Sequence, residues 1–174
     1  PSERHLKSTA LRSVSAKGSS GPALATLRPS QTFHFGDEVI RCVQWNPANH
    51  SQILAAGSNG IATLITFMEK TEEFVVQSRY HSTFDFVFRG SGLYISCEIN
   101  SISWCPDDRY FFAESGIDGG KLRIWDVRNE RNPLCEVRWP SSSTNIKQIN
   151  SIIWASKRTL IVGFSDGEAT ILKT

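Results

Sequence analysis

The chain has 174 residues, of which 40% are hydrophobic, 10% aromatic and 21% charged. This is the composition of a soluble globular domain, and it excludes a collagen, a coiled coil and a wholly disordered chain. A chain of this length buries a sizeable core without needing disulfides. No apolar run is long enough for a membrane-spanning helix, and none near the first residues predicts a secretory signal.

The net charge of +2 is the sum of two segments of the chain with opposite charge. Residues 1–31 have a balance of +4, and residues 32–174 have a balance of −2. The first part is rich in Ser, Ala, Gly and Lys and contains no aromatic residue. Such a segment buries too little apolar surface to offset its ordering entropy, so we expect a disordered basic tail. The part that folds is not a general polyanion binder.

Four cysteines form no C-x-x-C pair: Cys42, Cys97, Cys105 and Cys135. Without a secretory segment, we expect reduced and mostly buried thiols in a cytoplasmic or nuclear protein.

Three segments of the chain resemble one another, which indicates an internal repeat. Residues 99–104 and 149–154 share the pattern Ile-Asn-Ser-Ile-x-Trp, and residues 39–45 match it more loosely and also end in Trp. Each is followed by a polar turn and a second apolar strand, at residues 52–57, 110–115 and 159–164.

Further strands complete each unit. A third strand is predicted at residues 61–67, 121–127 and 168–173, and a fourth at residues 73–79 and 134–139. The chain is therefore predicted to be all-β, with nearly three units of four antiparallel strands. That pattern is typical of the blades of a β-propeller. The boundaries we expect are 37–80, 99–139 and 149–174, within a domain of residues 32–174.

The middle unit carries a resemblance to a known family. Its segments Trp104-Cys-Pro-Asp-Asp-Arg-Tyr and Gly119-Gly-Lys-Leu-Arg-Ile-Trp-Asp resemble the first-strand exit and the third strand of WD-repeat propellers. The resemblance implies an incomplete WD-repeat propeller and a set of structural residues in its blades. That set is Ser115, Asp118, Trp125, Trp45, Trp104 and Trp154.

Three units do not close a propeller ring. The last unit ends after its third strand, so residues 168–173 present an edge, and we expect the isolated chain to self-associate. Thr32–Phe35 is a candidate for the missing strand if the ring is otherwise complete. The long segment Tyr80–Glu98 predicts part of an outer strand or an additional hairpin.

Trp125-Asp126-Val127-Arg128 is the most specific functional motif. It resembles the box by which some WD-repeat proteins dock onto the adaptor of cullin ubiquitin ligases. The resemblance implies Arg128, with Asp126 beside it, as partner-binding residues. The alternative is that Arg128 only pairs with Asp126 or Glu130.

No motif predicts catalysis. Gly163-Phe-Ser-Asp-Gly matches the hydrolase pattern G-x-S-x-G, but a strand rather than a helix is predicted to follow it. Gly119-Gly120-Lys121 lacks the remaining residues of a phosphate-binding loop. The four histidines have no metal-ligand spacing. We therefore expect no enzyme activity, no cofactor and no metal.

The function that we predict is a non-catalytic scaffold for protein–protein interactions within a larger complex, inside the cell in the cytoplasm or nucleus. One alternative is a substrate receptor for a cullin ligase. Another is a nucleic-acid-associated subunit of a transcription complex, which would use the basic tail in a salt-sensitive, sequence-independent mode.

Overall fold

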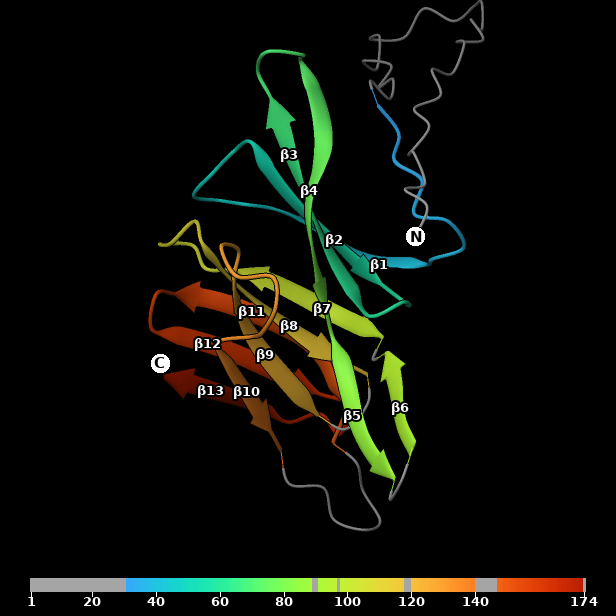
Figure 1. The fold of residues 1–174 in the computed structure, drawn as a ribbon. Helices are drawn as coiled ribbons and strands as arrows, with labels where there is room; N and C mark the ends of the chain where they lie inside the picture. Colours follow the sequence, from blue (N-terminus) through green and yellow to red (C-terminus); the bar gives the residue numbers. More distant parts are fainter. Residues whose placement is uncertain (1–30, 89–90, 97, 118–119, 140–146, 174) are drawn as a thin grey trace, which may run out of the picture. The chain divides into compact units, whose positions relative to one another are not determined.

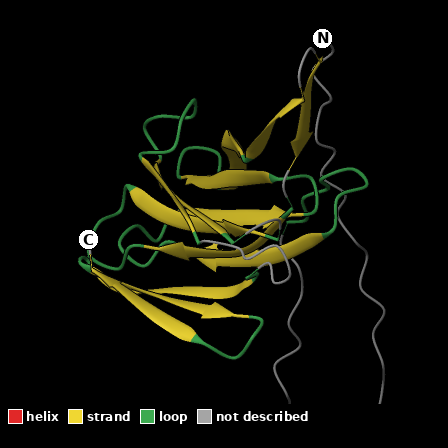
Figure 2. Cartoon of the chain, turned by 90° about the horizontal axis from the view of Figure 1, so that it is seen from below, coloured by secondary structure: helices red, strands yellow, loops and turns green. Residues whose placement is uncertain are grey.

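The structure is a computed structural model that describes residues 31–88, 91–96, 98–117, 120–139 and 147–173. Every regular element in these residues is a strand (Figure 2). None of the described residues belongs to a helix that is long and apolar enough to cross a bilayer. The chain divides into two compact units, Pro1–Asp37 and Glu38–Thr174, and the thirteen strands of the described residues lie in the second unit.

The first sheet is an antiparallel meander of four strands in the order β1-β2-β3-β4 (Figure 1). Its strands are β1 (Ile40–Trp45), β2 (Gln52–Gly57), β3 (Ile61–Met68) and β4 (Glu73–His81). Short turns join them; the first two contain Asn or Gly, whereas the β3–β4 turn places Glu72 at a φ of 55°. At the β2–β3 turn, Gly60 has a φ of 68°, which favours glycine.

The second sheet repeats this plan in the order β10-β9-β8-β7, and the third has only the order β11-β12-β13. The strands of the second are β7 (Ile99–Trp104), β8 (Phe111–Gly116), β9 (Lys121–Asp126) and β10 (Cys135–Arg138). Those of the third are β11 (Ile149–Ser156), β12 (Thr159–Phe164) and β13 (Ala169–Lys173). A separate hairpin, β5 (Thr83–Phe88) with β6 (Ser91–Ser96), lies between the first and second sheets in sequence.

The predicted fold class is confirmed: the described chain is all-β, with two four-stranded antiparallel sheets and a third of three strands. The segment after Tyr80 contains the additional hairpin, and β4 ends just inside it at His81. Thr32–Phe35, the candidate for the missing strand of a complete ring, has no strand conformation in the structure. An extended segment is not stable as a strand without a partner to complete its hydrogen bonds.

The core consists of two apolar clusters, one between each pair of successive sheets. The first lies between the first and second sheets and contains Leu54 and Leu64 with Trp104 and Trp125. The second lies between the second and third sheets and includes Leu122, Ile152 and Leu160. The second sheet is therefore buried on both faces. Nearly every residue of β8 and β9 is accordingly buried or half-buried, including the charged Glu114, Lys121 and Arg123.

Gly57, at the end of β2, marks a close approach of two backbones. A Cβ atom there would lie 1.9 Å from the carbonyl oxygen of Val39. Only glycine fits at this position, so the start of β1 is held against the end of β2.

Candidate functional site

Successive sheets are joined by a repeated hydrogen bond at the end of the first strand of each. Gln44 Oε1 accepts the backbone N–H of Trp104 at 2.8 Å, and Ser103 Oγ accepts the backbone N–H of Trp154 at 2.8 Å. Both acceptors lie one residue before the tryptophan of their own sheet. The second and third sheets are therefore each bonded at this place to the sheet before it, and further polar contacts, such as Tyr80 Oη to the Val127 carbonyl, cross the same interfaces.

The tryptophans of these first strands differ in burial. Trp104 is 1% exposed and Trp154 is 7% exposed, because each lies against the sheet that precedes it. Trp45, assigned to the same structural set, differs: it is 50% exposed. No sheet precedes β1 in the described residues, so the face of the first sheet that holds Trp45 has no such neighbour.

Ser115 and Trp125, two residues of the structural set implied by the family resemblance, lie on opposite faces of the second sheet. Trp125 is buried in the first cluster, whereas Ser115 lies on the opposite face of the second sheet, because it pairs with Leu122 rather than with a residue on the Trp125 face. Ser115 Oγ and Trp125 Nε1 are both buried without a hydrogen-bond partner in the described chain. Asp118 lies outside the described residues.

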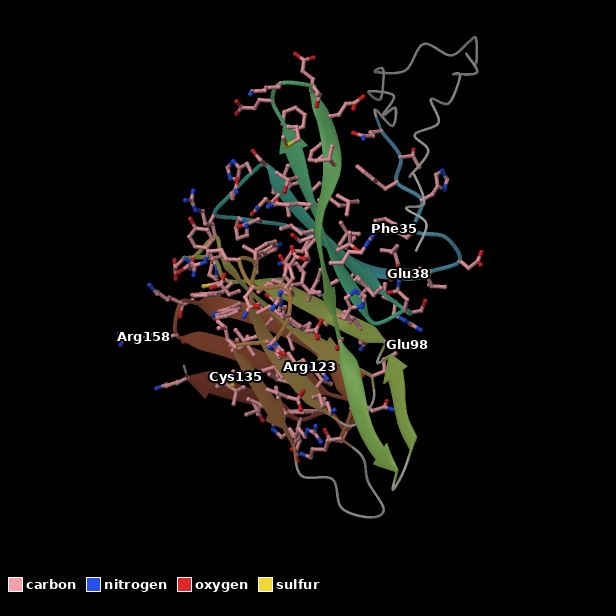
Figure 3. All side chains as sticks on the ribbon, viewed as in Figure 1. Phe35, Glu38, Glu98, Arg123, Cys135 and Arg158 are labelled. Atoms are coloured by element: carbon pink, nitrogen blue, oxygen red, sulfur yellow. The ribbon has the colours of Figure 1, made fainter. Side chains whose placement is uncertain are left out.

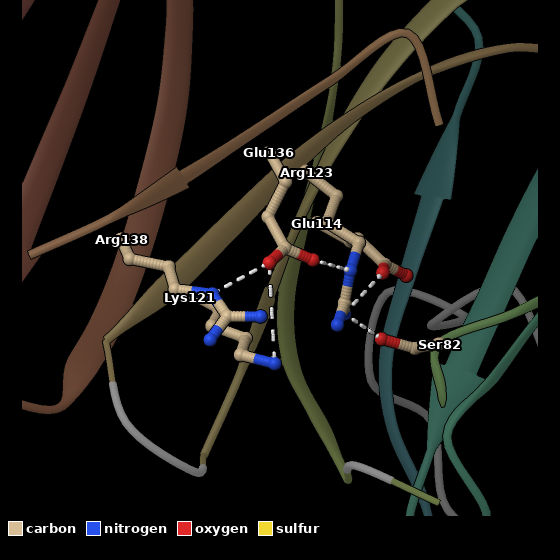
Figure 4. Close-up of polar contacts among 6 residues, drawn as sticks. All are labelled: Ser82, Glu114, Lys121, Arg123, Glu136 and Arg138. Atoms are coloured by element: carbon tan, nitrogen blue, oxygen red, sulfur yellow. Dashed lines mark hydrogen bonds and ion pairs between the residues drawn. The ribbon is translucent and has the colours of Figure 1, made fainter. Parts of the chain in front are cut away.

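Glu114 and Arg123 lie on the face of the second sheet that holds Trp125, and they form a buried ion pair (Figure 4). Arg123 Nη1 is 3.2 Å from Glu114 Oε1 and also donates to the hydroxyl of Ser82, which follows β4. Arg123 Nε donates to Glu136 Oε2 at 2.8 Å, and Arg138 Nε donates to Glu136 Oε1 at 2.7 Å. These side chains join β8, β9 and β10 to the end of the first sheet.

The pKa values of Glu114 and Glu136 are shifted in opposite directions. Desolvation raises the pKa of Glu114, which is fully buried, and bonds from Ser82 and Arg123 offset the rise only in part. Burial also raises the pKa of Glu136, but hydrogen bonds from Arg138 and Arg123 outweigh it and hold the pKa below its usual value. One oxygen of Glu114, Oε2, is buried without a hydrogen-bond partner in the described chain.

Sequence reasoning missed this pair. The sequence does contain an indication of it: Glu114 lies in the middle of the strand Phe111–Gly116. Burial of its carboxylate costs free energy unless a cation lies beside it. Arg123, opposite Glu114 in the neighbouring strand, is that cation.

Asp126 and Arg128, the predicted partner-binding residues, bind each other at the end of β9. Asp126 Oδ1 accepts Arg128 Nε at 2.8 Å, and Oδ2 accepts Arg128 Nη2 at 2.6 Å. The guanidinium also lies over the ring of Tyr110, 4.3 Å from its centroid. Hydrogen bonds from Arg128 lower the pKa of Asp126. The Arg128 side chain remains 59% exposed.

An apolar patch lies on the outer face of the first sheet. Val43 is 64% exposed, and Trp45 lies edge-on to Phe74 with a centroid distance of 6.0 Å. Phe67 packs on Phe74 with a centroid distance of 5.0 Å. We call Val43, Trp45, Phe67 and Phe74 the aromatic patch. Exposed patches of this kind mark interaction surfaces.

The described cysteines are free thiols. Cys105 is buried, Cys42 is half-buried and Cys135 on β10 is exposed (Figure 3). Burial raises the pKa of Cys42 to about 11, so its thiol is protonated at neutral pH. The described residues contain no cluster of His, Cys, Asp and Glu that would hold a metal ion. Cys97 lies outside the residues whose side chains the structure describes.

Comparison with known proteins agrees with this architecture. The family "WD domain, G-beta repeat" matches residues 84–126, a span that ends at the Trp125-Asp126 pair. The crystal structure of the Myceliophteria thermophila Cps50 (Swd1) β-propeller domain superimposes with a TM-score of 0.52 and 13% identity. The match covers 79% of this chain and 37% of the other, so the chain spans little more than a third of that propeller. No curated protein matches the sequence.

The sheets are thus the blades of a β-propeller that is incomplete in the described residues. The resemblance to WD-repeat proteins is confirmed: a WD-repeat family model matches residues 84–126, and the chain has the fold of part of a β-propeller.

Proposed function

We propose that the chain is a non-catalytic scaffold for protein–protein interactions, acting inside the cell within a multi-subunit complex and binding a protein partner at the aromatic patch. WD-repeat propellers typically serve as such scaffolds. The proposal includes no catalytic step and no cofactor.

The observation that supports this proposal is the contrast between equivalent tryptophans. Trp104 and Trp154 are buried by a neighbouring sheet, whereas Trp45, in the same place on the first sheet, is half exposed. Exposure of the apolar side chains of Trp45 and Val43 to water costs free energy. A partner protein that covers them, as a neighbouring sheet covers Trp104 and Trp154, would recover that free energy.

The test is co-purification with the 174-residue chain from cells, comparing Val43→Asp with Leu134→Asp. Both residues are exposed, by 64% and 56%, but Leu134 lies just before β10 on the second sheet. We expect Val43→Asp to remove the bound partner and Leu134→Asp to retain it. Deletion of residues 1–31 should leave the partner bound, because the aromatic patch lies in the strands that follow. Equal retention by both variants contradicts the proposal, as does loss of every partner on tail deletion.

A second candidate function is docking to the adaptor of a cullin ligase through Arg128. The specific observation is that Arg128 remains 59% exposed at a strand exit, although its guanidinium is bonded to Asp126. Docking would exchange that bond for one to the adaptor. Arg128→Ala should remove adaptor binding while Arg131→Ala, an exposed arginine nearby, retains it. The nucleic-acid alternative rests on residues 1–31, which lie almost entirely outside the described chain, and predicts binding of RNA or DNA that is lost with the tail.

A further inference from the structure

A groove lies beside β4, the outermost strand of the first sheet (Figure 1). Its volume is about 540 Å³, within the range of protein ligand sites, which is roughly 300–1,000 Å³. Glu130 and Arg131, in the connection between β9 and β10, line it together with residues of β4. The β4 residues are Val76, Gln77, Ser78, Arg79 and His81. The groove is therefore formed where the first and second sheets meet.

Two hydrogen bonds join the elements that form the groove. Ser78 Oγ donates to Glu130 Oε1 at 2.6 Å, and Tyr80 Oη donates to the carbonyl of Val127, which follows β9, at 2.8 Å. Both bonds link β4 to the connection between β9 and β10. The groove is therefore formed before a ligand binds, so a ligand loses little binding free energy in shaping it.

The backbone of β4 presents hydrogen-bonding groups at its outer edge. Ser82, just after β4, donates its backbone N–H to the carbonyl of Gly60 at 2.8 Å and so faces inward, toward β3. Because the direction of the backbone groups alternates along a strand, those of Arg79 and His81 point away from β3. In the described chain no strand pairs with this edge. Two successive pairs of donor and acceptor are therefore available to an added antiparallel strand.

The charge of the groove determines which strand fits it. Arg79, His81 and Arg131 are exposed. Neither arginine side chain forms a hydrogen bond or an ion pair with a described residue, although Glu38 attracts Arg79 from beyond ion-pair distance. Glu130 is the acidic residue of the lining, and its carboxylate already accepts a hydrogen bond. The groove therefore attracts an acidic ligand and disfavours a basic one.

An extended acidic segment of another protein has the backbone and the charge that this groove requires. We propose that such a segment adds to residues 78–81 of β4 as an antiparallel strand, with one acidic side chain beside Arg79 and a second beside His81. Paired residues of neighbouring strands have their side chains on the same face, where opposite charges stabilise the pair. The basic segment of residues 1–31, with a balance of +4, does not have the complementary charge.

The ligand residue between the two acidic residues faces the opposite side of the sheet. Ser78 and the Glu130 carboxylate bonded to it lie on that side. A third acidic side chain would be repelled there, so we expect a small polar residue at this position. The ligand pattern is therefore acidic, small polar, acidic.

The first measurement is an NMR titration of the 174-residue chain with two capped peptides, Thr-Glu-Thr-Glu-Thr and Thr-Lys-Thr-Lys-Thr. We expect the acidic peptide to shift the amide resonances of Arg79 and His81 downfield, because both amides gain a hydrogen bond. It should bind about tenfold more tightly than the lysine peptide, and high salt should reduce this difference. Equal affinities of the two peptides, or unchanged resonances of the two amides, overturn the proposal.

N-methylation of the acidic peptide tests the strand pairing without altering the protein. In the antiparallel pair, the N–H groups of both Glu residues point toward β4 and that of the Thr between them points away. Methylation of the two Glu nitrogens should weaken binding by about tenfold or more, because two hydrogen bonds are lost. Methylation of the central Thr nitrogen is the matched control and should leave the affinity unchanged. Equal effects of the two modifications exclude strand addition and overturn the proposal.

A pair of charge reversals locates the site. Arg79→Glu should weaken binding of the acidic peptide by about tenfold. Lys70→Glu makes the same change of charge in the exposed turn between β3 and β4, outside the groove, and should weaken binding by less than about twofold. Undiminished binding to Arg79→Glu places the peptide elsewhere and overturns the proposal. Val43→Asp, which tests the aromatic patch, should leave peptide binding unchanged, so this inference and the proposed function fail separately.

Discussion

Ser103 on the second sheet and Trp154 on the third are linked by a hydrogen bond in which the buried Ser103 hydroxyl accepts the Trp154 backbone N–H at 2.8 Å. Gln44 has the same relation to Trp104. The acceptor differs, a hydroxyl in one case and an amide carbonyl in the other, but the donor is the same backbone group. The repeat therefore preserves a geometry rather than a residue type.

We expect Ser103→Ala to lower the free energy of unfolding by about 1–3 kcal/mol, because it leaves a buried N–H without its acceptor. The measurement is denaturant unfolding followed by tryptophan fluorescence. Ser165→Ala, at an exposed position, is the control and should change stability by less than about 0.5 kcal/mol. Equal effects of the two substitutions would show that the bond contributes nothing to the joint between sheets.

Trp125→Ala should cost about 3–5 kcal/mol, the range for removal of a buried aromatic side chain. Trp125 is 1% exposed and packs in the first cluster with Phe112 and Tyr80. Trp45→Ala is the matched comparison and should cost less than half as much, because Trp45 is half exposed. An unchanged unfolding midpoint for Trp125→Ala would contradict its burial between the two sheets.

Gly57→Ala should destabilise the first sheet by about 1–3 kcal/mol, as overpacking does. The added Cβ would overlap the Val39 carbonyl, a backbone atom that cannot rotate away. Hydrogen exchange should show faster opening of β1 with little change in β12. Exchange that is uniform across the molecule would contradict a local effect.

Glu114 makes stability depend on pH in a predictable direction. Its pKa in the folded protein lies above the usual 4.5, so the stability associated with its protonated form is present below pH 4.5 and is lost as pH rises through the raised pKa. Glu114→Gln has no charge to desolvate. The stability of the variant relative to the parent should therefore increase as pH rises above 4.5, measured by urea unfolding at several pH values. A difference that does not change with pH would mean that the Glu114 pKa is not raised.

Arg128→Ala should raise the pKa of Asp126 toward its usual 3.8, because the variant loses the side-chain hydrogen bonds that lower it. Carboxyl carbon NMR during an acid titration measures this directly. The sign for stability is opposite to that of Glu114: the contribution of Asp126 is present above pH 3.8 and is lost as pH falls through the lowered pKa. The loss of stability as pH falls should therefore be smaller in Arg128→Ala than in the parent chain. An unchanged Asp126 titration would contradict the bidentate pair.

The repeat and its strands could be predicted from the sequence because they depend on local alternation and on turn residues. Ile-Asn-Ser-Ile-x-Trp, repeated at residues 99–104 and 149–154, was sufficient to align two sheets. The burial of Trp45 could not be predicted in this way, because it depends on whether a neighbouring sheet covers that face and not on the strand itself.

The face of the sheet on which Ser115 lies is open to a similar error. A sequence match to the family's pattern places Ser115 with Trp125, but the side chains of adjacent residues point to opposite faces, so an error of one position exchanges Ser115 for Glu114. The pair of Asp126 and Arg128 was open to prediction, since the two residues are separated by one position at a strand exit. The cation–π contact with Tyr110 was not, because it joins two different strand ends.

Burial of the second sheet on both faces implies an order in which the molecule opens. Each sheet contacts only its immediate neighbours, so the array resembles a short one-dimensional stack in which the middle member has two stabilising interfaces and each outer member has one. Within the residues that the structure describes, the third sheet has three strands and one interface, so the amides of the 174-residue chain should exchange with solvent first in this sheet. Those of β8 should exchange last, at a rate set by global unfolding. Unfolding of such a molecule begins at its third sheet. The ion pair of Glu114 and Arg123 breaks only in global unfolding.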